Sequence, residues 1–187
     1  WLNSENKCSW RPFQLGFILQ NIPSLFNKAH EDRDIVDLLW VRTGGGKTEA
    51  YLGLSAFTMF LGRLRKENLG CEVMMRYTLR LLSLQQFQRA TRLIMACEII
   101  RRVDRFEILG DCQPFTIGLY AGMSVTPNKV KGTRVNAEDT AEYALRHWKT
   151  KGKLPPSSNP IQIKECPWCG FNLKHNNHEI QLSGAFT

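Results

Sequence analysis

The sequence predicts an α/β fold in which a parallel sheet carries helices on both faces. Three short apolar runs, at 35–41, 71–78 and 115–122, have the length and character of buried strands. Between them lie two longer segments, 47–67 and 79–103, whose apolar residues recur at helical spacing. Because strands and helices alternate along the chain, we expect consecutive strands to run parallel, with right-handed crossovers.

Further helices are expected on either side of this alternating region. One should begin near Pro12, because proline suits a first helical turn, and it should bend or end at Pro23. Residues 123–134 read as a loop. Residues 137–150 are expected to form a helix, since acidic residues occupy the first turn and basic residues the last, as the helix dipole favours.

The domain organisation follows from these elements. Residues 1–150 are expected to form the α/β domain, residues 151–163 a linker rich in Pro and Ser, and residues 164–187 the start of an incomplete insertion that carries two cysteines. The sequence begins at Trp1 without an initiator methionine and stops soon after the cysteine pair. We therefore expect it to be a piece of a longer protein.

Charge and cysteine content indicate the kind of partner and the cellular compartment to expect. The chain has 187 residues, 43% of them hydrophobic, with 25 Lys and Arg against 17 Asp and Glu. Such a basic balance favours a polyanionic partner such as nucleic acid, although a basic part of a larger neutral protein would look the same. With no signal peptide and no run long enough to span a membrane, we expect a cytoplasmic protein with reduced thiols and no membrane partner.

Residues 41–51, VRTGGGKTEAY, place three glycines directly before a lysine and a threonine. Phosphates need several converging backbone N–H groups, and glycines leave room for them at the start of a helix. In such a P-loop, or Walker A motif, Lys47 reaches the β- and γ-phosphates of ATP and the Thr48 hydroxyl holds Mg²⁺. The alternative is a plain glycine turn, which would not require the Lys-Thr pair.

The predicted nucleotide site can be stated residue by residue. Lys47 and Thr48 are the predicted catalytic residues. The predicted ATP-binding residues are Gln14, Thr43, Gly44, Gly45, Gly46, Lys47, Thr48 and Glu49.

The form T-G-x-G-K-T at 43–48 resembles the P-loop of superfamily 2 helicases and translocases, although Val41 stands where a small residue is common. The resemblance implies a partial RecA-like lobe. Upstream, Arg11-Pro12-Phe13-Gln14 resembles the adenine-reading element of these enzymes, in which the amide of Gln14 would match the adenine edge. The alternative for Gln14 is an ordinary exposed residue at a helix start.

Two further segments resemble motifs that grip the nucleic-acid backbone in these enzymes. Segment 76–90, RYTLRLLSLQQFQRA, would contribute donors and charge to phosphates, and segment 118–128, GLYAGMSVTPN, a glycine turn with hydroxyl donors. The alternative for the first is an amphipathic helix with solvated arginines. The predicted nucleic-acid contacts are Thr78, Arg80, Gln85, Gly122, Ser124 and Thr126.

Taken together, segments 43–57, 76–90 and 117–128 resemble the large helicase subunit of DISARM-type anti-phage defence systems, over roughly residues 10–130. Arg42 departs from the proline that these relatives more often carry. The resemblance implies an ATP-driven motor that loads on DNA, single-stranded or duplex, beside other defence-system subunits.

Cys166-Pro-Trp-Cys169-Gly170 has the spacing of a zinc knuckle, which turns both sulfurs toward one metal. His175 and His178 could complete a four-ligand Zn²⁺ site, or a second cysteine pair could lie beyond Thr187. A redox pair or two free thiols are the alternatives.

ATP hydrolysis needs an Asp-Glu pair at a strand end to hold Mg²⁺ and orient water, and no such pair follows a predicted strand here. We therefore expect the chain by itself to bind ATP weakly at best and not to be competent for hydrolysis. Two other readings stay open: a P-loop kinase or transferase, and a non-enzymatic basic zinc-ribbon module that binds nucleic acid.

Overall fold

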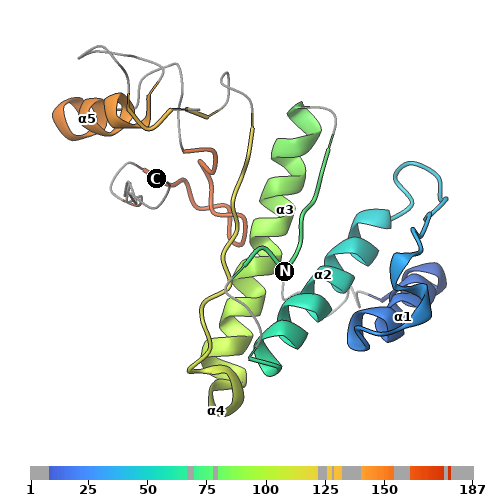
Figure 1. The fold of residues 1–187 in the computed structure, drawn as a ribbon. Helices are drawn as coiled ribbons and strands as arrows, with labels where there is room; N and C mark the ends of the chain where they lie inside the picture. The colour runs from blue at the N-terminus through green and yellow to red at the C-terminus, as the bar shows by residue number, and fades with distance from the viewer. Residues whose placement is uncertain are drawn as a thin grey trace. The chain divides into compact units, whose positions relative to one another are not determined.

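The computed structural model describes residues 9–66, 70–77, 80–121, 126–127, 129–131, 140–153, 161–174 and 177; of residues 80–83 and 145 it describes the backbone alone. The described elements are helical (Figure 1). In chain order they are α1 (Pro12–Phe26), the 3-10 helix η1 (Glu31–Asp34), α2 (Lys47–Leu64), α3 (Arg80–Ile99), the π-helix η2 (Ile100–Asp104), α4 (Phe106–Leu109) and α5 (Ala141–Lys151).

The predicted helices are confirmed where the structure describes them. Helix α2 accounts for segment 47–67, and α3 with η2 accounts for segment 79–103. Helix α1 begins at Pro12 as predicted but continues three residues beyond Pro23. Helix α5 has Glu142 in its first turn and Lys149 and Lys151 in its last, so the predicted match to the helix dipole holds for this helix.

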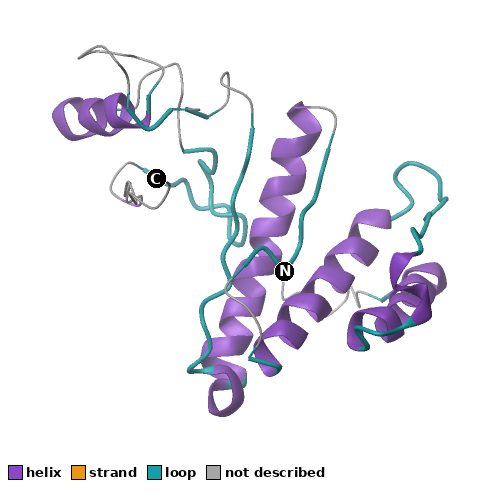
Figure 2. Cartoon of the chain, in the orientation of Figure 1, coloured by secondary structure: helices purple, strands orange, loops and turns teal. Residues whose placement is uncertain are grey.

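The predicted parallel sheet is wrong. The described part of the chain contains no strand, and Figure 2 draws only helices and loops there. The apolar runs at 35–41, 71–77 and 115–121 are loops. The RecA-like α/β lobe that the resemblance implied is therefore not the fold of the described residues.

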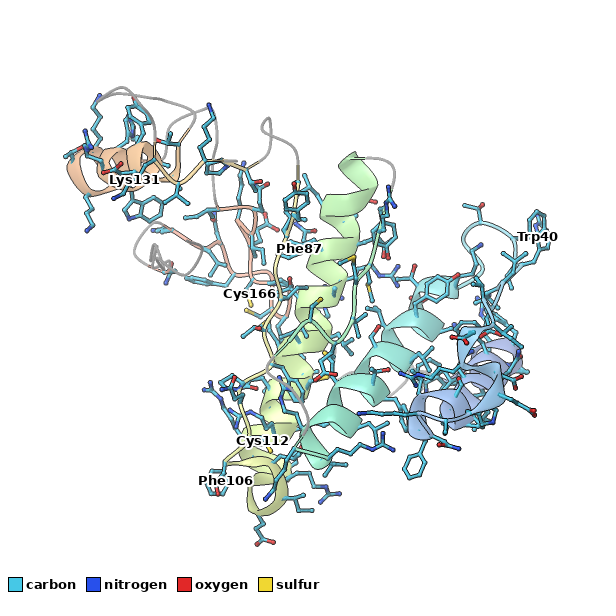
Figure 3. All side chains as sticks on the ribbon, in the orientation of Figure 1. Trp40, Phe87, Phe106, Cys112, Lys131 and Cys166 are labelled. Atoms are coloured by element: carbon cyan, nitrogen blue, oxygen red, sulfur yellow. The ribbon has the colours of Figure 1, made fainter. Side chains whose placement is uncertain are left out.

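The physical reason is visible in the first of these runs. A strand is stable only when a neighbouring strand satisfies its backbone groups and a packed face covers its side chains. In this run Val36, Leu38 and Trp40 are 91%, 80% and 88% exposed, and Figure 3 shows Trp40 projecting away from the chain. Pairing elsewhere in the described residues is limited to isolated bridges, Lys129 with Thr140 and Glu165 with Asn172.

The chain divides into two compact units. Unit 1 comprises Trp1–Met75 and Ala96–Phe115, and unit 2 comprises Arg76–Met95 and Thr116–Thr187. In unit 1, α1 packs on α2: the rings of Phe17 and Tyr51 meet edge to face at 5.7 Å. The domain limits predicted at residues 150 and 164 stay a prediction.

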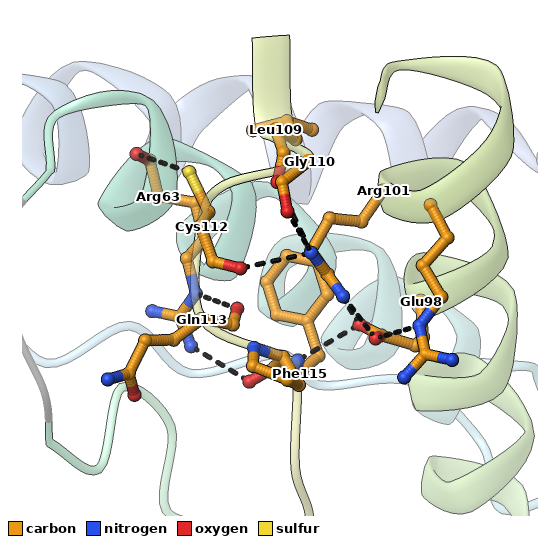
Figure 4. Close-up of polar contacts among 10 residues, drawn as sticks. Arg63, Glu98, Arg101, Leu109, Gly110, Cys112, Gln113 and Phe115 are labelled. Carbon is orange, nitrogen blue, oxygen red and sulfur yellow. Dashed lines mark hydrogen bonds and ion pairs between the residues drawn. The ribbon is translucent and has the colours of Figure 1, made fainter. Parts of the chain in front are cut away.

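A buried ion pair organises the other end of unit 1. Arg101, only 6% exposed, lies in the π-helix η2 and makes two hydrogen bonds to the carboxylate of Glu98, at 2.9 and 2.6 Å. Its remaining nitrogen donates to the backbone carbonyls of Leu109, Gly110 and Cys112 (Figure 4). One guanidinium thereby joins the end of α3 to the loop that follows α4.

Glu98 completes this cluster from the other side. Its carboxylate also accepts from Arg102 at 2.6 Å and from the backbone N–H of Phe115 at 3.1 Å. The ring of Phe115 packs edge to face on Phe60, with the guanidinium of Arg63 over its face. The hydrogen bonds from Arg101, above all other influences, lower the pKa of Glu98 from 4.5 to about 2.

We predict that Glu98→Gln lowers the free energy of unfolding by about 3 kcal/mol, because it leaves the buried charge of Arg101 without its counter-ion. The folded-state pKa of Glu98 lies below its unfolded value, so its contribution is present above pH 4.5 and is lost as the pH falls toward 2. Denaturant unfolding at several pH values measures both effects, and the difference between variant and wild type should shrink in acid.

The matched control is Glu142→Gln, which breaks an exposed pair with Arg146 in α5. We expect this change to cost less than about 1 kcal/mol. Equal effects of the two substitutions, or a Glu98→Gln penalty that grows in acid, would contradict the role assigned to Glu98.

Candidate nucleotide-binding site

The glycine loop forms the turn that starts α2. Gly44 and Gly46 have φ angles of 79° and 94°, in the left-handed region that favours glycine, and Gly46 is the N-cap of the helix. The N–H of Gly45 donates to the carbonyl of Arg42 at 2.9 Å, which closes the turn. The loop-then-helix half of the predicted motif is therefore present, although the strand expected before it is not.

Gln14 connects this loop to helix α1. Its side chain is 4% exposed; the amide nitrogen donates to the carbonyl of Gly46 at 2.8 Å, and the amide oxygen accepts from the backbone N–H of Arg11 at 2.8 Å. The guanidinium of Arg11 donates to the carbonyl of Gly45, also at 2.8 Å. The residue predicted to read adenine thus holds the loop in place, and its contact with adenine stays a prediction.

Gly46 is required by this arrangement. A Cβ atom built on Gly46 would lie 2.8 Å from the amide nitrogen of Gln14, well inside van der Waals contact, and its φ angle is unfavourable for other residues. Sequence reasoning placed Gln14 at the site but missed Arg11 as a loop contact. The signal was present in the same four-residue segment, because an arginine at a helix N-cap can reach a neighbouring carbonyl.

Lys47, Thr48 and Glu49 follow in the first turn of α2 and are half-buried. The ammonium group of Lys47 contacts the carbonyl of Val41 and lies 3.3 Å from that of Arg42, so it folds back over the loop. These two carbonyls hold the ammonium group of Lys47 close to the glycine loop. Thr48 and Glu49 stay predicted ligand contacts.

The described residues hold no group of three or more His, Cys, Asp or Glu side chains placed to bind a metal. Beside the glycine turn, the first turn of α2 carries the ammonium group of Lys47 and the hydroxyl of Thr48, the two groups predicted to be catalytic.

The predicted nucleic-acid contacts belong to unit 2, whereas the glycine loop belongs to unit 1. Thr78, Gly122 and Ser124 lie outside the described residues. Arg80 is the first residue of α3, and Gln85 is exposed on the same helix. The hydroxyl of Thr126 donates to the carbonyl of Ala121 at 3.2 Å.

Cys166 and Cys169 lie on a tight turn in unit 2, and both are free thiols. The sulfur of Cys166 accepts hydrogen bonds from the backbone N–H groups of Cys169 and Trp168, and these lower the pKa of the Cys166 thiol. His175 and His178, the predicted further ligands, lie outside the described residues. The turn thus carries the two cysteines that are predicted to bind zinc.

The chain is 42% identical, over 176 residues, to DISARM protein DrmA from Bacillus paralicheniformis. The match covers 90% of this chain. The chain is related to this DISARM protein. It spans about 15% of that protein's length, so the comparison concerns one part of a much larger molecule. No family model and no solved structure matches the chain.

The extent of the match supports the predicted DISARM relation, because 90% of this chain includes most of the segments that carried the resemblance. It leaves the helicase subfamily undecided. No described helix combines the length and the apolar character that a membrane crossing requires.

We predict that Gln14→Ala lowers the free energy of unfolding by about 2 kcal/mol, because the carbonyl of Gly46 and the N–H of Arg11 lose a buried partner. Hydrogen exchange of the loop amides at 44–46 should accelerate as well. Gln20→Ala is the matched control: it removes an exposed amide of α1 that bonds Asp37 at 3.0 Å, and should change stability by less than about 0.5 kcal/mol. Unchanged loop exchange in Gln14→Ala would contradict the contact.

Proposed function

We propose that the glycine loop Thr43–Thr48 binds the phosphates of ATP with Mg²⁺, in a protein that acts in anti-phage defence. The defence role is supported by the relation to a DISARM protein. The nucleotide role is supported by the conformation of the loop at the start of α2, and this observation carries the proposal.

Backbone donors at the start of α2 are the first feature suited to phosphates. The first N–H groups of any α-helix have no partner within the helix. At α2 the N-cap is Gly46, which has no side chain to cap this end of the helix. The start of an α-helix is a common anion site because its backbone N–H groups point outward, and the helix dipole favours negative charge at the same place.

The side chains of Lys47 and Thr48 lie at the same end of α2 as these backbone donors. The ammonium of Lys47 lies against the loop carbonyls, so little rearrangement is needed for it to contact phosphate oxygens instead. The hydroxyl of Thr48 is the neighbouring ligand suited to Mg²⁺. When bound, Mg²⁺ supplies positive charge between phosphate oxygens, and the residues described here orient the nucleotide.

The residues at the glycine loop do not account for the activation of water that ATP hydrolysis needs. Hydrolysis requires carboxylates that hold the metal and orient water. No Asp-Glu pair follows an apolar run in the sequence, so we assign this chain nucleotide binding, with water activation supplied by other residues of the motor. The whole assembly is proposed to be a cytoplasmic DNA helicase or translocase that works with other defence-system subunits.

DNA contact is assigned to unit 2. Gln85 is exposed on α3, the helix whose first residue is Arg80, and the first turn of a helix offers neutral donors to phosphates. The excess of basic residues adds a general attraction to the DNA backbone, so binding to single strands or duplex should weaken as salt rises.

We predict that Lys47→Ala weakens binding of ATP·Mg²⁺ by about 10- to 100-fold, because a charge-assisted contact contributes about 1.5–3 kcal/mol. DNA-stimulated ATP hydrolysis by the intact protein should be abolished. Lys149→Ala, at an exposed position in α5, is the charge-matched control and should leave nucleotide affinity unchanged. Retained turnover in Lys47→Ala would overturn the assignment, and turnover indifferent to DNA would favour a kinase or transferase instead.

A second prediction concerns Gly46→Ala, which should also weaken ATP·Mg²⁺ binding by at least about tenfold. The added methyl group clashes with Gln14 and penalises the left-handed N-cap, so the loop must change shape. Gly16→Ala is the matched control, because a Cβ on Gly16 of α1 meets nothing within 4 Å. This control should bind normally and gain up to about 1 kcal/mol of stability. Normal nucleotide affinity in Gly46→Ala would show that the loop conformation is irrelevant to binding.

A further inference from the structure

Segment 164–173 of unit 2 forms a small hairpin. The N–H of Cys166 donates to the carbonyl of Phe171 at 2.8 Å, and the N–H of Leu173 donates to that of Lys164 at 2.8 Å. An antiparallel bridge joins Glu165 to Asn172 between these bonds. Two cysteines therefore sit on a backbone that is held on both sides of the turn.

The turn between the two cysteines is closed by a backbone hydrogen bond. The N–H of Gly170 bonds the carbonyl of Cys166 at 2.9 Å, and Gly170 has a φ angle of 74°, which a residue with a side chain rarely adopts. Cys166 and Cys169 thus lie at the two ends of one short turn, at the Cys-x-x-Cys spacing of structural zinc sites.

A side chain of helix α3 also forms a hydrogen bond to the hairpin. The guanidinium of Arg92, on α3, donates to the carbonyl of Pro167 at 2.5 Å. Pro167 lies inside the turn, between the two cysteines. The backbone that positions both sulfurs is thus tied to the helix that carries Gln85.

We propose that Cys166 and Cys169 bind a zinc ion as thiolates and that the hairpin 164–173, fastened to α3 by Arg92, is the frame of this metal site. A structural zinc takes four ligands, so two come from outside the hairpin. This inference is independent of the nucleotide site.

The geometry distinguishes this pair from a redox dithiol. Redox-active Cys-x-x-Cys pairs usually stand beside a strand–helix unit. Here the residues after Cys166 form one turn that leads through Gly170 into the return segment of the hairpin. Neither sulfur is in a disulfide bond.

The test is zinc content, measured by elemental analysis of the purified protein after chelation and reloading with zinc. We expect about one zinc per chain in the wild type and loss of this zinc in Cys166→Ser and in Cys169→Ser. Cys71→Ser, at an exposed cysteine of unit 1, is the matched control and should retain it. Zinc that persists in both knuckle variants, or a wild type that takes up none, would overturn the proposal.

Two further measurements do not depend on the cysteine variants folding. Cobalt added to the metal-free wild type should produce thiolate-to-metal charge-transfer absorption, and its absence would overturn the assignment of sulfur ligands. Zinc should slow hydrogen exchange in residues 84–95 of α3, and Arg92→Gln should reduce this effect while keeping the metal. Equal slowing in Arg92→Gln and wild type would show that Arg92 does not fasten the hairpin.

Discussion

The side-chain amide of Gln14 is the contact on which the candidate site depends. It is buried, and it uses both ends, one on the carbonyl of Gly46 and one on the backbone N–H of Arg11. Together with the bond from the guanidinium of Arg11 to the carbonyl of Gly45, it joins the start of α1 to the glycine loop. The left-handed turn at Gly46 and the position of Lys47 at the start of α2 belong to a loop held in this way.

A second polar cluster has the same character at the other end of unit 1. Arg101 is buried because the carboxylate of Glu98 and three backbone carbonyls satisfy its donors. A buried charge of this kind fixes one arrangement of the chain, since any other would leave it unpaired. The described part of the protein thus combines helix packing with specific polar contacts, and in unit 2 the bond from Arg92 to Pro167 joins α3 to the cysteine hairpin.

Local features could be predicted from the sequence, and features that need distant partners could not. Pro12 and the periodic apolar residues of 47–67 and 79–103 marked three helices, because helix signals lie within a few residues of one another. The run at 35–41 looked like a strand, but a strand requires a neighbour, and Val36 and Trp40 are exposed instead. The left-handed turn before Lys47 could be expected because a run of glycines followed by a helix is a local signal, whereas the bond from Gln14 to Gly46 joins residues far apart in the sequence. Arg101 was missed because a single arginine in a helix gives no sign of burial.

The measurement that tests the nucleotide site most directly is a titration of the isotope-labelled protein with ATP·Mg²⁺, followed by its backbone amide spectrum. The phosphate site predicts shifts concentrated at Gly44 to Thr48, with a further shift of the Gln14 side-chain amide, and little response to adenosine alone. Unchanged loop amides at saturating nucleotide, or shifts confined to other segments, would contradict it.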